Sequence, residues 1–224
     1  MSTTEISEAG QHEGGGHHES PRERHKKEHM ALWLFIGGDA VFFALEIFFW
    51  FYLRTLNVNG MWLGNACSKL NPCTDGLGNP ITAPISEANG LYTMGVAALI
   101  IVSAIFIWQA EIQARSGAHR KATTPLLGLA LVFCLVAIGL QIYQFQVLPF
   151  TTIDGAYASL FEFFMGSNLA HFLLVLVIAV GLFNRSRIGK LEHSNWYQAH
   201  LGRLWSVWVA ASATVLALIA TFLA

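Results

Sequence analysis

The segment from Met30 to Leu53 reads MALWLFIGGDAVFFALEIFFWFYL and decides the fold. It contains only two charged side chains, Asp39 and Glu46. Because roughly 20 apolar residues cross the hydrocarbon layer of a membrane as a helix, the segment predicts a transmembrane helix. It is too long for the apolar part of a signal peptide, and no small-residue cleavage site follows it. We therefore expect it to be kept in the protein.

Four more apolar runs of similar length predict four more spans, at residues 91–110, 126–147, 160–183 and 204–223. The chain of 224 residues is 54% hydrophobic and only 12% charged, whereas a soluble domain has about 25% charged residues. The predicted fold class is all-α, a polytopic bundle of five transmembrane helices. Residues 1–29 have too little apolar content to fold by themselves, so we expect a disordered tail there.

The basic residues predict the orientation of this bundle. Eleven of the thirteen lysine and arginine residues fall in the tail, the second connection or the fourth connection, and only Arg54 and Lys69 fall on the other side. The positive-inside rule then places the amino terminus in the cytoplasm and the carboxyl terminus outside.

The loop at residues 54–90 is rich in Gly, Pro and Asn and carries Cys67 and Cys73. With the predicted orientation it faces an oxidising compartment, which favours a disulfide between the two cysteines. Two free thiols are the alternative. No second Cys or His pair lies nearby to complete a tetrahedral metal site, so we expect no metal in this chain.

The predicted spans contain four Asp, Glu or His side chains and no Lys or Arg: Asp39, Glu46, Glu162 and His171. A charge in hydrocarbon is costly unless it is paired, neutralised or reached by water. Asp39 and Glu46 are seven residues apart and share one helix face. Asp39 and His171 differ in depth by about four residues, or roughly 6 Å. We therefore expect Asp39, with Glu46 as the alternative, to contact His171.

Two interpretations of these four residues remain open. They are either buried polar groups that fix helix packing or a proton-accepting site beside a water-filled path. Glu162, near a helix end, is expected to be an interfacial carboxylate that reaches water. One intramembrane histidine cannot hold both a haem and a copper, so we expect neither a redox centre nor a catalytic residue in this chain.

Two segments resemble subunit III of the haem–copper cytochrome oxidases, in its short, five-helix bacterial form. In the first span the shared pattern is a Trp-Leu-Phe run, a carboxylate, a Phe pair and a closing aromatic run: Trp33-Leu34-Phe35, Asp39, Phe42-Phe43 and Trp50-Phe51-Tyr52. The second segment resembles the family's Asp-Gly-x-Tyr-x-Ser-x-Phe pattern and the following Gly-x-His-x-x-His: residues 154–161, then Gly166 to His171 with Asn168 at the first histidine. The stretch Trp196, Tyr197 and His200 fits the family pattern less well, with Arg203 where an aspartate is expected.

The resemblance implies a non-redox subunit in the plasma membrane of a bacterium. Its partners would be the catalytic subunit I, which holds haem and copper, and other oxidase subunits. The complex would oxidise cytochrome c or quinol and reduce oxygen with proton pumping. The subunit would support proton uptake and hold structural phospholipid, with Phe42 and Phe43 against acyl chains and Arg115 and Arg187 near headgroups.

Two alternatives have other functions. The Gly37-Gly38-Asp39 sequence is similar to an accessory subunit found beside nitric oxide reductases. A small proton-linked transporter would also contain intramembrane carboxylates, but the sequence has neither a discontinuous helix nor an inverted repeat.

Overall fold

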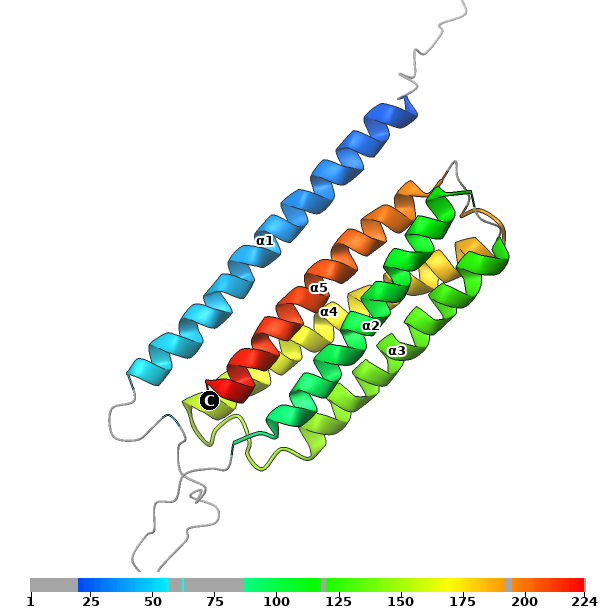
Figure 1. The fold of residues 1–224 in the computed structure, drawn as a ribbon. Helices are drawn as coiled ribbons and strands as arrows, with labels where there is room; N and C mark the ends of the chain where they lie inside the picture. Colours follow the sequence, from blue (N-terminus) through cyan, green and yellow to red (C-terminus); the bar gives the residue numbers. More distant parts are fainter. Residues whose placement is uncertain (1–19, 57–61, 63–86, 118–119, 192–194, 224) are drawn as a thin grey trace, which may run out of the picture.

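The computed structural model describes residues 20–56, 62, 87–117, 120–191 and 195–223. These residues form five helices and no strand, as the sequence predicts (Figure 1). All five are long and apolar enough to cross a membrane. The helices are α1 (Pro21–Thr55), α2 (Gly90–Arg115), α3 (Arg120–Gln146), α4 (Ala156–Arg187) and α5 (Tyr197–Phe222).

Helices α2 to α5 form an antiparallel four-helix bundle, and α1 runs along its outside (Figure 1). In the bundle α2 packs against α3 and α5, and α4 packs against α3 and α5. Helix α1 packs mainly against its neighbours α4 and α5. We call the end that carries the first turns of α1, α3 and α5 the basic end, because most of the lysine and arginine residues lie there.

Helix α1 begins nine residues before the predicted span, so residues 21–29 are helical and do not belong to a disordered tail. Ser20 and Glu23 form a capping box, and Pro21 occupies the first helical position. The Glu23 amide donates to Ser20 Oγ at 3.3 Å, and the Ser20 amide donates to Glu23 Oε2 at 3.2 Å. Such caps start helices. The rest of the predicted tail, residues 1–19, lies outside the described residues.

The other helices also extend beyond most of the predicted span ends. Helix α2 continues five residues past Ala110, and α5 begins seven residues before Leu204. Hydropathy detects only the apolar part of a helix, whereas the backbone stays helical into the more polar residues on either side. Gly117 and Gly189, with φ of 75° and 72°, lie just past the ends of α2 and α4, where glycine accepts the left-handed conformation at little cost.

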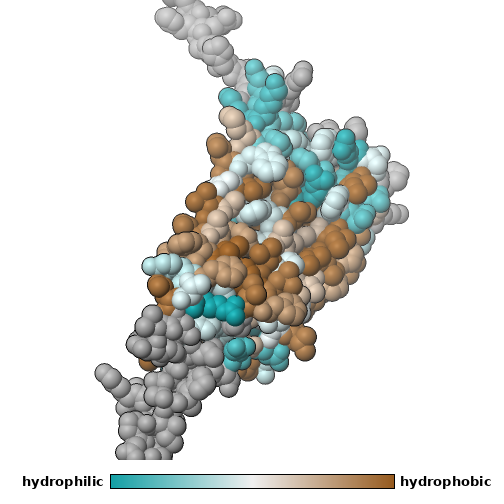
Figure 2. Space-filling model, turned by 60° about the vertical axis from the view of Figure 1, so that its left-hand side comes forward, coloured by the Kyte–Doolittle hydropathy of each residue, from teal (hydrophilic) through white to brown (hydrophobic). Residues whose placement is uncertain are grey.

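The surface of the molecule matches a membrane environment. Figure 2 shows hydrophobic side chains over the middle of the molecule and hydrophilic residues gathered at the end where α1 begins. Small residues let the bundle helices approach closely, as in other membrane proteins. At Gly202 of α5, for example, an added Cβ would lie 2.8 Å from Leu182 Cδ1 of α4.

An aromatic cluster closes the bundle at the end opposite the basic end. The Trp50 ring lies 5.5 Å from that of Tyr157 and 5.1 Å from those of Trp62 and Phe164. The Ala88 amide donates to Tyr157 Oη at 3.0 Å, and the Tyr157 amide donates to the Trp62 carbonyl at 2.9 Å. Tyr157 therefore joins two described parts of the long loop, at Trp62 and Ala88, to α4.

Replacing Tyr157 with phenylalanine tests this fastening. The change keeps the ring but leaves the buried Ala88 amide without its acceptor, which costs about 1–3 kcal/mol. We expect the purified chain in detergent to unfold at a lower denaturant concentration. Tyr143→Phe is the matched control, because the Tyr143 side chain is 52% exposed. Equal stability of the two variants would contradict the proposed role of the hydroxyl.

Candidate functional site

A polar centre lies where α1 meets α4 and α5, halfway along α1. Asp39 Oδ1 lies 2.8 Å from His171 Nε2, which is the contact expected from the sequence. Trp208 of α5 donates its indole N–H to Asp39 Oδ2 at 2.5 Å. The Asp39 and His171 side chains are 14% and 16% exposed. Asp39 therefore joins the outer helix to two helices of the bundle.

The hydrogen bonds of His171 show where its protons must be. Its Nδ1 lies 2.7 Å from the Ser167 carbonyl oxygen, which only accepts, so Nδ1 carries a proton. The contact between Nε2 and Asp39 Oδ1 then needs one more proton. It resides either on the imidazole, facing a carboxylate, or on Asp39, facing a neutral imidazole. The pair thus shares one transferable proton and has no net charge in either arrangement.

Glu46 lies two turns further along α1 and is almost fully buried, at 2% exposure. The Ser167 side chain lies close to its carboxyl group. Its Oε1 atom is buried without a partner among the described residues. His171 pairs with Asp39 and not with Glu46, the alternative partner expected from the sequence. Glu46 is therefore the third ionisable group of the polar centre.

A groove of about 560 Å³ opens beside this centre between α1 and α4. Its polar lining includes Asp39, His171 and Glu162, and its apolar lining includes Phe42 and Phe163, whose ring centroids are 5.9 Å apart. Glu162 accepts a hydrogen bond from Thr152 Oγ1 at 2.7 Å. The groove is therefore lined by two carboxyl groups and a histidine, contributed by both helices.

The residues expected to bind lipid do not form one site. Phe42 lines the groove, but Phe43 turns toward the bundle and packs against Trp208 at 6.0 Å. Arg115 and Arg187 lie at the basic end, where their guanidinium groups stack over Trp196 and Phe183 at 5.1 and 5.9 Å. Neither arginine lines the groove. Cys67 and Cys73 lie outside the described residues, and their disulfide stays a prediction.

A second polar cluster, at the basic end, was not predicted. The buried carboxyl group of Glu111 in α2 lies 3.0 Å from His200 Nδ1 and 3.0 Å from Arg203 Nε, both in α5. Arg203 also stacks over Trp108 at 5.4 Å. The predicted span ended at Ala110, one residue too early to include Glu111. An acidic residue directly after an apolar run, with helix continuing beyond it, was the available signal.

The polar centre can hold a proton inside the apolar middle of the molecule. Asp39 and His171 share a proton. Glu162 lies nearer the helix end, and Glu46 is buried in the helix interface. This is a set of groups suited to accept or relay protons, and equally suited to fix three helices. No protein-family model matches the chain, and no curated protein matches it in sequence.

Proposed function

We propose that the chain is a non-redox accessory subunit, of the subunit III kind, in a respiratory haem–copper oxidase of a bacterial plasma membrane. In that complex a catalytic subunit I would carry haem and copper and pass electrons to oxygen with proton pumping. This chain would pack against it, stabilise it, support proton uptake and hold phospholipid. It would be part of an enzyme without being catalytic itself.

The contact between Asp39 and His171 supports this proposal most strongly. These residues come from the two segments that carry the resemblance to subunit III, and they lie 2.8 Å apart although 132 positions separate them in the sequence. The same two segments meet again near the carboxyl-terminal end of α1, where Trp50 packs against Tyr157. Residues of the two segments therefore contact one another at two places along α1.

A role in proton uptake is supported by the chemistry of the polar centre. A carboxyl group and an imidazole that share one proton can exchange it without leaving a net charge in hydrocarbon. Groups that do this inside membranes commonly belong to proton paths. A role in lipid binding is supported by the groove, whose apolar rings flank its polar residues.

Purification of the tagged full-length chain from its own membranes in a mild detergent tests the proposal. We expect haem absorbance in the visible spectrum and co-migration with a larger, haem-containing membrane subunit on a native gel. A colourless chain that migrates alone under several mild detergents would contradict the proposal and favour a transporter.

The gas that the co-purified complex consumes distinguishes the two oxidoreductase alternatives. With a reduced electron donor we expect oxygen consumption. Consumption of nitric oxide without oxygen consumption would assign the chain to a nitric oxide reductase, the alternative that Gly37-Gly38-Asp39 favours.

A further inference from the structure

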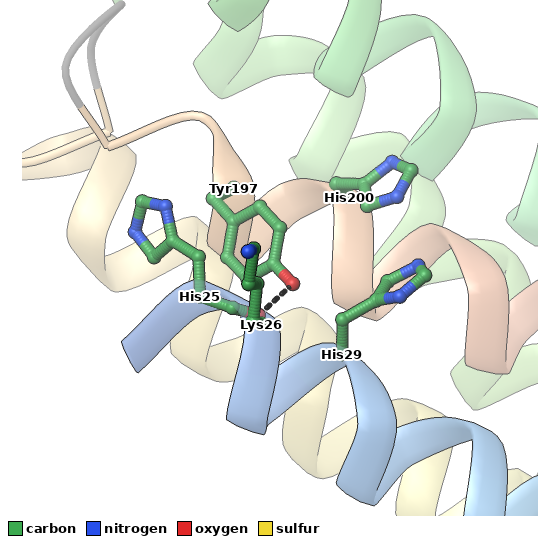
Figure 3. Close-up of a pocket in the computed structure, with 5 residues that line it drawn as sticks. All are labelled: His25, Lys26, His29, Tyr197 and His200. Carbon is green, nitrogen blue, oxygen red and sulfur yellow. Dashed lines mark hydrogen bonds between the residues drawn. The ribbon is translucent and has the colours of Figure 1, made fainter. Parts of the chain in front are cut away.

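A pocket of about 470 Å³ lies at the basic end, between the first turns of α1 and α5, and is not part of the polar centre. Five side chains line it: His25, Lys26, His29, Tyr197 and His200. Figure 3 shows them around Tyr197, with His25 and His29 on either side of its ring. We call it the histidine pocket. None of its lining side chains is acidic.

Stacking and hydrogen bonds hold the walls of the histidine pocket in place. The His25 ring stacks on Tyr197 at 4.2 Å, and Tyr197 Oη donates to the His25 carbonyl oxygen (Figure 3). The His29 ring stacks on that of His200, with centroids 5.9 Å apart and planes at 15°. The pocket is therefore a preformed junction between α1 and α5.

Lys26 and His29 supply hydrogen-bond donors to the pocket. Trp33 donates its indole N–H to His29 Nε2 at 3.2 Å, so in a neutral His29 the proton must be on Nδ1, which can donate. Lys26 adds an exposed ammonium group with three donors. Within the part of the chain that the structure describes, no carboxylate forms an ion pair with Lys26.

Two carboxylates at this end of the molecule are paired with other cations. Glu28 is paired with Arg24 at 2.9 Å, and Glu111 lies against Arg203 and His200. The local surplus of donors and positive charge suits an anion with several acceptor oxygens. A phosphate group has this chemistry.

The position of the pocket agrees with a phosphate at the membrane surface. Its α1 residues come directly before Met30, where the apolar part of the helix begins. Figure 2 shows the hydrophilic surface at this end giving way to the hydrophobic middle. Phosphate groups of lipids lie at that depth of a bilayer.

We propose that the histidine pocket binds a phosphate group, carried either by an anionic lipid headgroup or by a soluble phosphate ester. Bound there, the phosphate would bridge α1 and α5 and hold the outer helix against the bundle. Every lining residue belongs to this chain, so the site does not depend on the proposed oxidase function.

Native mass spectrometry of the purified full-length chain tests the site. The probes are vesicle-derived phosphatidylglycerol and phosphatidylcholine at equal concentration. We expect preferential retention of phosphatidylglycerol by the unaltered chain, a loss of roughly fivefold in that retention for Lys26→Gln, and recovery in Lys26→Arg. Lys190→Gln is the matched control, because Lys190 is exposed at the same end but does not line the pocket.

Competition by glycerol 3-phosphate distinguishes the two sources of phosphate. Displacement of phosphatidylglycerol by the ester would show that the pocket accepts a free phosphate, and resistance to it would assign the site to a lipid headgroup. The proposal is overturned if Lys26→Gln and Lys190→Gln retain the same amount of phosphatidylglycerol. It is also overturned if the unaltered chain retains both lipids equally.

Discussion

Replacing Asp39 with alanine is expected to destabilise the chain by about 3–5 kcal/mol, the usual cost of removing one partner of a buried charged pair. The change leaves His171 Nε2 and the Trp208 indole N–H without their shared hydrogen-bond partner. It also removes the side chain that joins α1 to both α4 and α5 in the middle of the bundle. Denaturant titration of the purified chain in lipid nanodiscs measures this loss.

Asp39→Asn separates the structural role of this residue from its proton. The amide oxygen can accept from Trp208, and the amide N–H can donate to Nε2 of a neutral His171, which keeps its Nδ1 proton for the Ser167 carbonyl. We expect a loss of only about 1 kcal/mol, because both hydrogen bonds survive. The shared proton is absent, so a proton role would be lost while the fold remains.

The control for both variants is Glu162→Gln. Glu162 lines the same groove, but its hydrogen bond goes to Thr152 near the helix end. We expect it to be close to the unaltered chain in stability. If Asp39→Ala proves no less stable than Glu162→Gln, Asp39 does not hold α1 to the bundle.

The sequence was sufficient to predict the five helices and one contact of the polar centre. The apolar runs are long, and few other structures can satisfy their backbone hydrogen bonds in lipid. The contact between Asp39 and His171 followed from comparing depths along two helices, since an unpaired charge at that depth is costly. Both predictions rest on strong energetic penalties, which leave few arrangements to choose from.

The side-chain contacts that the sequence did not predict depend on smaller differences in free energy between alternative arrangements. Seven tryptophans are present, and nothing in the pattern singled out Trp208 as the donor to Asp39. Phe43 and Phe42 are neighbours of the same type, yet one packs inward and the other lines the groove. Which of the two faces the bundle depends on how α1 is rotated about its axis. That rotation depends in turn on the packing of α1 against α4 and α5.

The cluster around Glu111 was missed for a different reason. It lies where the helices leave the apolar region, and hydropathy ends a span at the first charged residue. The structure shows that α2 and α5 continue through this region and pair their charges there. Charged residues just outside predicted spans are therefore worth comparing between helices that end at the same side.

Replacing Arg203 with alanine is the second change for which we expect a large effect. Glu111 is 3% exposed, and Arg203 Nε lies 3.0 Å from its Oε2. Removing the guanidinium group leaves a buried carboxylate with only His200, and we expect a loss of about 3 kcal/mol. Arg203→Lys should recover part of it, because lysine keeps the charge but not the planar stack over Trp108.

Arg187→Ala is the matched control for Arg203→Ala, because Arg187 also stacks on an aromatic ring at the basic end but is exposed. The same denaturant titration should show little change for it. The paired variant Glu111→Leu with Arg203→Met decides the cause. Replacing a whole buried ion pair with apolar residues costs far less than breaking it, so the paired variant should be more stable than Arg203→Ala alone. Glu111→Leu and Arg203→Met are also measured singly. If their two losses of stability simply add in the paired variant, the cost of Arg203→Ala comes from lost packing on Trp108 and not from the unpaired carboxylate.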